Sequence, residues 1–345
     1  MRARVRWGIV GTGGIARRTV GDLQLCDTVE LVGICSRDKD RADQFASEHS
    51  IPFASADFDA FCASGQVDAV YVGIPHGLHF DYAARALRAG VHVVCEKPLT
   101  MTSAEAEELH RLSRENGAFL MEAMWMKFTP AFRAVTEILG SGTIGEPRLI
   151  QAGAGFPVPP DGPARYWVAE LGGGALYDLG VYTIALAHAV LGTPDQVIAV
   201  GKMRDDGVDE QVAYTLRYDS GAVAQLTNSL TAFIPPGGWI GGTRGSITVG
   251  EPLFAPRSLR VVTGQPPAPP TVEELDFDQE GAGYVPMFRA ASEAILRGDV
   301  EHPIHPVSAT VAVLQILERV RAELVEARDR AGTGGQLGAL SRPGP

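Results

Sequence analysis

The sequence contains little cysteine, and the cysteines it has are scattered. All four lie in the first third of the chain and form no C-x-x-C pair: Cys26, Cys35, Cys62 and Cys95. This spacing argues against a disulfide framework or a zinc site and predicts small buried hydrophobic residues in a reduced cytoplasm. The pairs His76/His79 and His302/His305 have no acid or thiol beside them in a ligand pattern, so no metal site is expected.

The chain also lacks a long basic run and a long hydrophobic run. Its formal net charge of −11 would repel the phosphates of nucleic acid or of an anionic membrane surface. No apolar stretch approaches the ~20 residues that span a bilayer. The apolar run Trp7–Val10 is only as long as a strand and has no small-residue cleavage site. We therefore expect no nucleic-acid partner, no membrane partner and no signal peptide.

What is present is the composition of an ordinary globular protein. Its 345 residues, of which 45% are hydrophobic and 21% charged, are enough for two domains with complete cores. Strands alternate with helices as far as residue 123, whereas strands dominate afterwards. The pattern predicts a nucleotide-binding α/β domain over 1–123, an α+β domain over 124–330, and a mobile Gly/Pro-rich tail over 331–345.

A glycine-rich turn joins the first predicted strand, Val5–Val10, to a helix that runs to about Leu25. It reads Gly11-Thr12-Gly13-Gly14-Ile15-Ala16, the G-x-G-x-x-A/G pattern of a dinucleotide-binding (Rossmann) fold. One glycine makes the tight turn, the next lets the backbone approach a pyrophosphate, and the helix N-terminus offers unpaired N–H groups to the phosphates. A plain strand-to-helix turn is the alternative, but the flanking strand and helix favour cofactor binding.

The end of the second predicted strand, Glu30–Cys35, indicates which nucleotide is bound. An NAD site places an acid there for the ribose 2′-hydroxyl, whereas this chain has Ser36 and Arg37, with Arg41 one turn later. A hydroxyl and guanidinium groups suit a 2′-phosphate, so we predict NADP rather than NAD. Asp38 is interpreted as the cap of the next helix. Alternatively, both arginines are solvated residues of a helix face.

Another buried strand, Asp68–Ile74, ends at Pro75 and is followed by His76 and His79. These residues lie at the same sheet edge as the glycine-rich turn, where ligands of open α/β sheets bind. We therefore expect Ile74, Pro75 and the histidines to contact the cofactor. A capping or packing role fits the histidines equally well.

The β-branched strand Val91–Cys95 is followed by Glu96, Lys97 and Pro98. This tripeptide also lies beyond the carboxyl end of a strand, where chemistry is expected. Proline biases the preceding residue toward extended geometry, so the Lys97 ammonium leaves the sheet in a defined direction. We place Glu96 and Lys97 at the cofactor site. A surface lysine after a strand is the alternative.

Strand-like runs dominate the second half of the chain. They are expected at about 147–156, 195–201, 210–219, 222–231, 245–250 and 258–263, followed by a helix over about 306–327. Asp219-Ser220-Gly221 predicts a hairpin. Before it, apolar and more polar residues alternate over 212–218, which predicts a sheet with one buried and one open face. Such a sheet often pairs with a second subunit, so we expect a homodimer or a dimer of dimers.

A second glycine-rich stretch, Gly172-Gly173-Gly174, leads into a predicted helix that carries Asp178 and Tyr182. Residues four apart share one face of a helix. The rest of this helix is apolar, and a buried acid needs a partner. A structural aspartate and a tyrosine packed in the core are the alternative.

Together these motifs resemble one family, the Gfo/Idh/MocA oxidoreductases, and the likeness extends to about residue 325. It is carried by the turn at 11–16, by Glu96-Lys97-Pro98 and by the second glycine-rich stretch with Asp178 and Tyr182. Further stretches resemble the branch of dimeric dihydrodiol dehydrogenases and NADP-dependent D-xylose dehydrogenases: Ser36-Arg37-Asp38 with Arg41, Cys95 before Glu96, Met121–Trp125, and Phe277 followed by Gly281–Gly283.

The resemblance implies an α/β Rossmann domain followed by an α+β domain with a large open-faced, mostly antiparallel sheet used for dimerisation. It also implies NADP as the cofactor and Lys97 and Tyr182 as catalytic residues. Inositol dehydrogenases of the family carry histidine where this chain has Tyr182 and an acid near position 36. Both departures count against an NAD-linked inositol enzyme.

Four aromatic residues match family positions that wall an apolar pocket: Trp125, Phe156, Phe254 and Phe277. Aromatic faces bind either an aromatic diol or the C–H face of a sugar. A role in the core is the alternative for at least one of them. Arg165 and Trp167 lie where relatives touch cofactor or substrate, and they are left unassigned.

The mechanistic hypothesis assigns proton transfer to Tyr182. A free tyrosine has a pKa near 10, which is too high for an effective base at neutral pH. We expect the Lys97 ammonium to favour the phenolate and to bind the substrate oxygen, so that the two groups titrate together. Asp178 is expected to orient Lys97 or the substrate.

The sequence therefore predicts a cytoplasmic, NADP-dependent oxidoreductase that acts on a sugar, an aldose or a vicinal diol or carbonyl. One alternative is a reductase of a keto-sugar carried on a nucleotide, which would need additional basic residues around the cleft; the loop Phe156–Arg165 supplies only Arg165. A non-catalytic NADP-sensing protein is a further alternative. The intact set Lys97, Asp178 and Tyr182 argues against it, because a sensor needs no proton donor.

Overall fold

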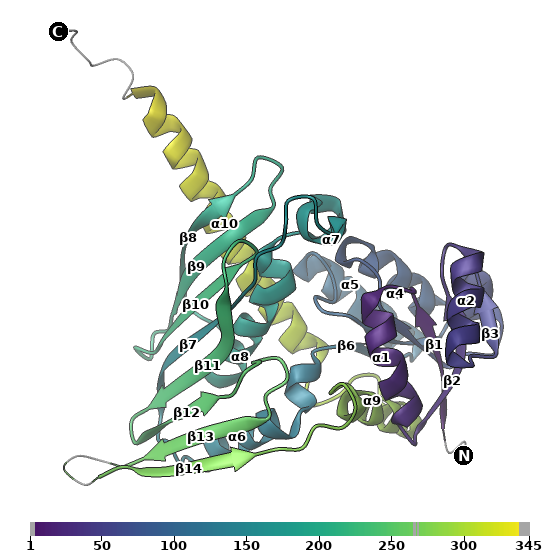
Figure 1. Ribbon diagram of the computed structural model, residues 1–345, viewed down its shortest axis with the longest axis horizontal. Helices are drawn as coiled ribbons and strands as arrows, with labels where there is room; N and C mark the ends of the chain where they lie inside the picture. Colours follow the sequence, from purple (N-terminus) through teal and green to yellow (C-terminus); the bar gives the residue numbers. More distant parts are fainter. Residues whose placement is uncertain (1–3, 265–266, 268, 338–345) are drawn as a thin grey trace.

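The computed structural model describes residues 4–264, 267 and 269–337. It contains two sheets, a six-stranded parallel sheet and an eight-stranded mixed sheet that is mostly antiparallel (Figure 1). The predicted fold class is confirmed: a Rossmann-like domain is followed by an α+β domain with a large sheet.

The first sheet has the strand order β3-β2-β1-β4-β5-β6. Its strands are β1 Val5–Val10, β2 Val29–Cys35, β3 Phe53–Ser55, β4 Ala69–Val72, β5 His92–Cys95 and β6 Leu120–Glu122. Every residue of β4 is buried, as expected for a central parallel strand that is covered on both faces. The carboxyl ends of β1, β4 and β5 adjoin one another, which brings the turns after Val10, Val72 and Cys95 to one edge.

Helices follow most of these strands: α1 Gly14–Leu25, α2 Lys39–His49, α3 Phe58–Ala63, η1 His76–Leu78, α4 His79–Arg88 and α5 Ser103–Asn116. The predicted cap of α2 is confirmed, because the Asp38 side chain accepts a hydrogen bond from Arg41 N. Helix α5 begins with a capping box between Thr102 and Glu105 and ends at Gly117 in the left-handed conformation.

The second sheet has the order β14-β13-β12-β11-β7-β10-β9-β8. Its strands are β7 Pro147–Gly155, β8 Gln196–Met203, β9 Asp209–Arg217, β10 Val223–Ser229, β11 Ile234–Gly242, β12 Gly245–Val249, β13 Ser258–Thr263 and β14 Thr271–Asp276. Only the β7–β10 pair is parallel among the described strands of this sheet. The predicted β9–β10 hairpin is confirmed, and the alternating side chains Val212, Tyr214 and Leu216 are all buried.

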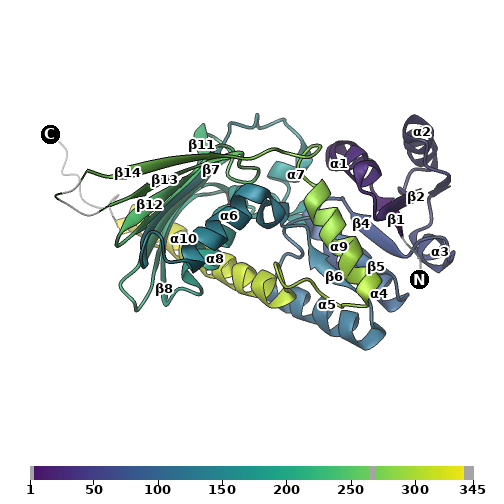
Figure 2. The ribbon, with the colours of Figure 1, turned by 90° about the horizontal axis from the view of Figure 1, so that it is seen from below.

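The remaining helices are η2 Trp125–Phe128, α6 Pro130–Gly140, α7 Ala164–Trp167, η3 Ala169–Leu171, the π-helix η4 Leu176–Gly180, α8 Val181–Leu191, α9 Val285–Arg297 and α10 Val307–Leu337. Helices α6, α8 and α10 lie on one face of the second sheet, and no described element covers the other face (Figure 2). Helix α9 crosses back to pack against α1 and the first sheet.

Some element boundaries differ from those predicted. Strands β11 and β14 were not expected, and α10 continues past Ala327 to Leu337. The first residues of the predicted tail are therefore helical, and residues 338–345 lie outside the described residues. All four cysteines are free and buried, as predicted.

One helical stretch, Ala169–Leu191, is long and apolar enough to cross a membrane by length and composition alone. The expectation that no stretch meets this criterion is therefore wrong. Most of the stretch is buried inside the fold, where it forms the core beneath the second sheet. A core helix satisfies the same criterion.

Candidate active site

A cavity of about 860 Å³ lies between the two sheets, at the carboxyl edge of the first. It brings together residues from both halves of the chain. The predicted site residues that line it are Gly13, Gly14, Ile15, Ile74, Pro75, His76, Glu96, Lys97, Trp125, Phe156, Asp178, Tyr182 and Phe254. Those that do not line it are Gly11, Thr12, Ser36, Arg37, Arg41, His79 and Phe277.

The glycine-rich turn forms one wall of this cavity. Gly11 has φ +100°, and a Cβ there would lie 2.7 Å from Gly73 O, so only glycine fits. At Gly13 and Gly14 a Cβ would meet nothing within 4 Å, and the N-terminus of α1 opens onto that space. The turn therefore fits the pyrophosphate of a dinucleotide.

The end of β2 lies farther along the same edge. Ser36 N donates to Ser55 O at 3.1 Å, and Arg37 and Arg41 are exposed. Neither guanidinium makes a hydrogen bond or ion pair with another described residue. Two unpaired cations at this position fit an anionic group on the adenosine ribose.

Lys97 reaches across the cavity to the second glycine-rich stretch. Its Nζ donates to Asp178 O at 2.6 Å and to Asp178 Oδ1 at 3.4 Å. It also lies 4.7 Å from the centroid of the Tyr182 ring. An ammonium and a phenol that are 182 − 97 = 85 positions apart in the sequence therefore face the same space.

Asp178 belongs to the π-helix η4, which precedes α8. Burial alone would raise the pKa of its carboxyl group, but the charges of Lys97 and Arg165 bring that pKa below its ordinary value. Arg165 Nη1 lies 3.3 Å from Asp178 Oδ1, so two cations share this carboxylate. Asp178 is therefore ionised, and it holds Lys97 in place.

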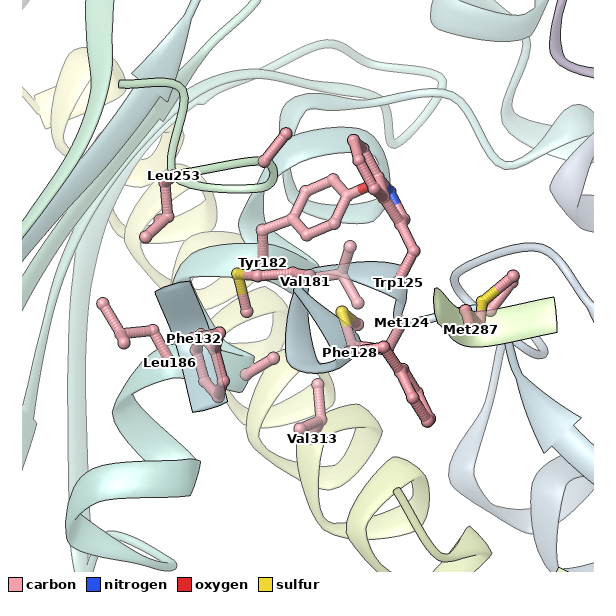
Figure 3. Close-up of a cluster of buried hydrophobic side chains, with 14 of the residues drawn as sticks. Met124, Trp125, Phe128, Phe132, Val181, Tyr182, Leu186, Leu253, Met287 and Val313 are labelled. Atoms are coloured by element: carbon pink, nitrogen blue, oxygen red, sulfur yellow. The ribbon is translucent and has the colours of Figure 1, made fainter. Parts of the chain in front are cut away.

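The Tyr182 hydroxyl accepts a hydrogen bond from Trp125 Nε1 at 2.8 Å. In Figure 3 the hydroxyl end of Tyr182 lies beside the indole ring of Trp125. Burial, with Tyr284 and Glu96, raises the pKa of Tyr182 well above 10. The protonated phenol is therefore favoured, and the role of Lys97 in forming a phenolate stays a prediction. The ammonium lies over the ring face rather than beside the hydroxyl, and Asp178 engages it.

The two histidines have different environments. His76 lines the cavity with Nδ1 3.3 Å from Gly172 O, and burial lowers its pKa to about 3, so the ring is neutral. His79 is fully buried, with its ring nitrogens 2.8 Å from Pro98 O and 2.8 Å from Ile74 O. His79 therefore has a packing role, in which it ties two strand-end turns together.

Aromatic rings form the far wall. Phe254 lies 6.0 Å from Trp125 and 5.4 Å from Tyr182, measured between ring centroids. Phe156 lines the same cavity. Phe277, which was expected with them, directly follows β14 and instead borders a separate hollow beside Phe128.

Several cavity residues were not predicted. Arg18 lies over the rings of Trp125 and Tyr284, at 5.4 and 5.7 Å from the two centroids, and these rings stack on each other at 4.2 Å. Because Arg18 comes four residues after Gly14 on α1, helical spacing places it on the face above the cofactor turn. This four-residue spacing was the sequence signal that could have identified Arg18 as a site residue. Phe233, which is 82% exposed, stands at the cavity mouth.

The second glycine-rich stretch is anchored on Asp209, a buried residue at the start of β9. Asp209 Oδ2 accepts a hydrogen bond from Leu176 N at 2.7 Å, and Gly174, with φ +123°, packs against Asp209 Oδ1, where no side chain fits. Burial raises the pKa of Asp209 to about 7. This contact fixes the backbone from which Asp178 projects. Within the described residues, no group of three acid, histidine or cysteine side chains has metal-binding geometry.

Comparisons with known proteins agree with this geometry. Residues 5–124 match the model of the oxidoreductase family with an NAD-binding Rossmann fold, and residues 132–248 match the GFO/IDH/MocA C-terminal domain. The trans-1,2-dihydrobenzene-1,2-diol dehydrogenase of Mus musculus is 32% identical over 322 residues, which cover 92% of this chain and 96% of that protein. Its Homo sapiens counterpart is 33% identical over 327 residues, with the same coverage.

Solved structures show the same architecture. A 3-ketoreductase from Actinomadura kijaniata, in complex with NADP and TDP-benzene, superposes with a TM-score of 0.80 at 31% identity, covering 93% of this chain and 98% of that one. An aldose-aldose oxidoreductase from Caulobacter crescentus, complexed with glycerol, has a TM-score of 0.83 at 24% identity, with 94% and 98% covered. The second likeness concerns the fold.

Proposed function

Because this chain belongs to the Gfo/Idh/MocA oxidoreductase family, we propose that it is an NADP-dependent dehydrogenase or reductase of a sugar, an aldose or a vicinal diol or carbonyl. The observation that carries the proposal is the meeting of Lys97 and Tyr182 in one cavity with the glycine-rich turn. A small carbonyl or alcohol that enters this cavity meets a proton donor, a cation and an aromatic wall.

The cofactor would bind along the carboxyl edge of the first sheet. The N-terminus of α1 would hold the pyrophosphate, and Arg37 and Arg41, with Ser36, would hold a 2′-phosphate. When bound, the nicotinamide supplies the hydride for reduction and accepts it for oxidation. The absence of an acid at position 36 supports NADP over NAD.

Tyr182 is the proposed proton donor. Its oxygen accepts from Trp125, which leaves its own O–H free to donate to a substrate carbonyl oxygen. The raised pKa keeps that proton in place until the substrate oxygen gains negative charge. Lys97 stabilises the phenolate that remains, because its ammonium lies over the ring, and Asp178 keeps Lys97 there.

The test replaces the proton donor. Tyr182→Phe should lower turnover by about a hundredfold or more, because it removes general acid catalysis, while NADPH affinity stays nearly unchanged. Turnover is followed through nicotinamide absorbance with a panel of sugars and dicarbonyls. Tyr214→Phe is the matched control, because it removes a buried phenol that bonds Thr183 and does not line the cavity. Wild-type turnover in Tyr182→Phe would disprove the assignment.

A second candidate, a reductase of a nucleotide-linked keto-sugar, is favoured by one observation. Two arginines, Arg18 and Arg165, line the cavity, whereas the sequence analysis expected only Arg165. A diphosphate linker would suit such a pair. If this candidate is correct, thymidine diphosphate should inhibit competitively against the sugar substrate at saturating NADPH. No inhibition at millimolar concentrations would favour the free sugar or diol.

We also propose that the open face of the second sheet joins two copies of the chain. The four buried free cysteines support a reducing compartment such as the cytoplasm. The same proposal divides the chain at about residue 123. The part before it would bind the cofactor, and the part after it would bind the substrate and form the dimer.

A further inference from the structure

Buried side chains hold the backbone of the turn that carries Lys97. Lys97 N donates to Glu96 Oε2 at 3.2 Å, Pro98 O faces His79 Nδ1 at 2.8 Å, and Leu99 N donates to Glu122 Oε1 at 2.9 Å. Proline has no N–H, so Leu99 offers the next backbone donor after Lys97. The turn therefore cannot shift without breaking one of these bonds.

Glu122, the last residue of β6, joins this turn to the C-terminal part of the chain. Its second oxygen, Oε2, accepts from His305 Nε2 at 2.7 Å and from Thr310 Oγ1 at 3.0 Å. The carboxyl group is 1% exposed, so no solvent competes for these bonds. One buried carboxylate thus receives donors from the Lys97 turn and from α10 with its preceding loop.

His305 in turn contacts a buried lysine that the proposed mechanism does not use. Lys127 Nζ lies 3.1 Å from His305 Nδ1. Burial and the Lys127 charge lower the pKa of His305 to about 4, so the ring is neutral at physiological pH. A neutral ring satisfies both neighbours only when Nδ1 accepts from Lys127 and Nε2 donates to Glu122.

Such an arrangement is a poor way to gain stability. Glu122 and Lys127 are both buried charges, and the imidazole keeps them from direct contact. Removing two charges from water is costly, and apolar residues of similar volume are often as stabilising. A fully satisfied hydrogen-bond network does, however, fix the position and the direction of the groups at its ends. One end of this network is the Lys97 turn.

We propose that Glu122 is a positioning residue that fixes the turn bearing Lys97, and that His305 holds Glu122 in place. On this account the C-terminal segment sets the geometry of the reacting centre without touching the substrate. The inference rests on the proposed function, since it requires Lys97 to act in turnover. Positioning matters because a displacement of about 1 Å can cost about a hundredfold in rate.

The experiment compares two substitutions of His305. His305→Leu removes the hydrogen bonds of His305 to Glu122 and Lys127 and should lower kcat by about tenfold. Substrate KM and NADPH Kd should stay within about twofold of wild type, because the cofactor turn is untouched. His305→Gln should retain most of the turnover, because an amide offers one acceptor and one donor as the neutral ring does. Steady-state kinetics, NADPH fluorescence titration and thermal melts supply the readouts.

Thr310→Val is a milder variant that tests the same hydrogen-bond network if His305→Leu does not fold. It removes one hydrogen bond to Glu122 at nearly constant volume and should lower kcat by about threefold. Glu318→Gln is the matched control. It weakens another bond of α10, that of Glu318 to Ser103 N and Oγ, which lies outside the Lys97 turn. This control should lower the melting temperature and leave kcat unchanged.

The outcomes separate the two proposals. Wild-type kcat in both His305→Leu and Thr310→Val, or an equal loss of kcat in Glu318→Gln, overturns the positioning role. If Lys97→Met abolishes turnover in the same assay while the variants at positions 305 and 310 keep it, only this inference is wrong. If Lys97→Met keeps wild-type turnover, the proposed function and this inference are both wrong.

Discussion

At the scale of single residues, burial sets the protonation state from which the proposed mechanism starts. The pKa of Tyr182 is raised, so its phenol is protonated before substrate arrives. If Tyr182 is the proton donor, as we propose, reduction of a carbonyl starts from this protonated phenol. In the reverse direction the phenol would first lose its proton, and the Lys97 ammonium over its ring would stabilise the phenolate.

Asp209 gives a prediction for stability against pH. In the unfolded chain its pKa is near 3.9, and in the folded protein burial raises it to about 7. Between these values the folded state binds a proton that the unfolded state has released, so the free energy of unfolding falls as pH rises. Over the whole interval, the loss from this one group is on the order of 4 kcal/mol.

Asp209→Asn should remove that dependence, because the amide does not titrate while its oxygen still accepts from Leu176 N. Urea unfolding at pH 5 and at pH 8 measures the difference. The wild-type protein should lose more stability than the variant between the two pH values. Parallel losses would show that Asp209 is ionised throughout this interval.

The sequence predicted the residues that carry a motif and missed those brought in by packing. Lys97 and Tyr182 each follow a recognisable pattern, and both line the cavity. Arg18 offered only its helical spacing from Gly14, and Tyr284 has no such pattern. Tyr284 reaches the cavity because Asp22 on α1 accepts hydrogen bonds from Ala282 N and Tyr284 N, contacts that join residues about 260 positions apart. No local signal predicts a contact of that range.

At the scale of elements, the proposed function assigns the choice between NADP and NAD to the turn between β2 and α2. Arg37 and Arg41 are exposed and have no acidic partner among the described residues. Replacing both with glutamine should weaken NADPH binding by about tenfold or more, since charge-assisted hydrogen bonds contribute about 1.5–3 kcal/mol each. NADH, which lacks the 2′-phosphate, should bind the variant and the wild type equally.

Fluorescence titration with each cofactor measures this selectivity. Arg17→Gln is a suitable control, because Arg17 is a nearby exposed arginine on α1 whose guanidinium is paired with Glu48. An equal loss of affinity for NADPH and NADH in the double variant would show that the two arginines do not read the 2′-phosphate.

In the second sheet, β11 and β14 were missed because neither shows the side-chain pattern of a strand. β11 contains Pro235-Pro236 and four of its nine residues are glycine, a composition that argues for a loop. It is a strand because β7 and β12 flank it and pair with its backbone. β14 has almost no buried residue, so it shows no alternation, and its pairing with β13 defines it. In both cases neighbouring strands override local preference.

At the scale of the whole molecule, the open face of the second sheet has no covering layer among the described elements. It carries apolar side chains: Val200 is 62% exposed and Ile198 is 45% exposed on β8, and Trp239 projects from β11 on the face opposite Ile240. If two copies pair through this face, Val200→Glu should weaken the dimer, because two-fold symmetry introduces the charge twice.

Light scattering after size-exclusion chromatography gives the mass of each species. The wild-type protein should elute as a dimer or a larger even assembly, and Val200→Glu should shift toward the monomer at micromolar concentration. Leu25→Glu is the control, since Leu25 is an exposed apolar residue at the end of α1, outside the second sheet. A monomeric wild-type protein would exclude pairing through this face.

The return of α9 to the first sheet has a consequence for how the protein is made. Trp7 and Tyr71, from the earliest strands, pack against Phe288 of α9, and Trp7 Nε1 donates to Ser292 Oγ at 3.0 Å. While the ribosome is still adding the residues between these segments, that apolar surface has no cover. We therefore expect the first domain to complete its packing only after α9 has been synthesised.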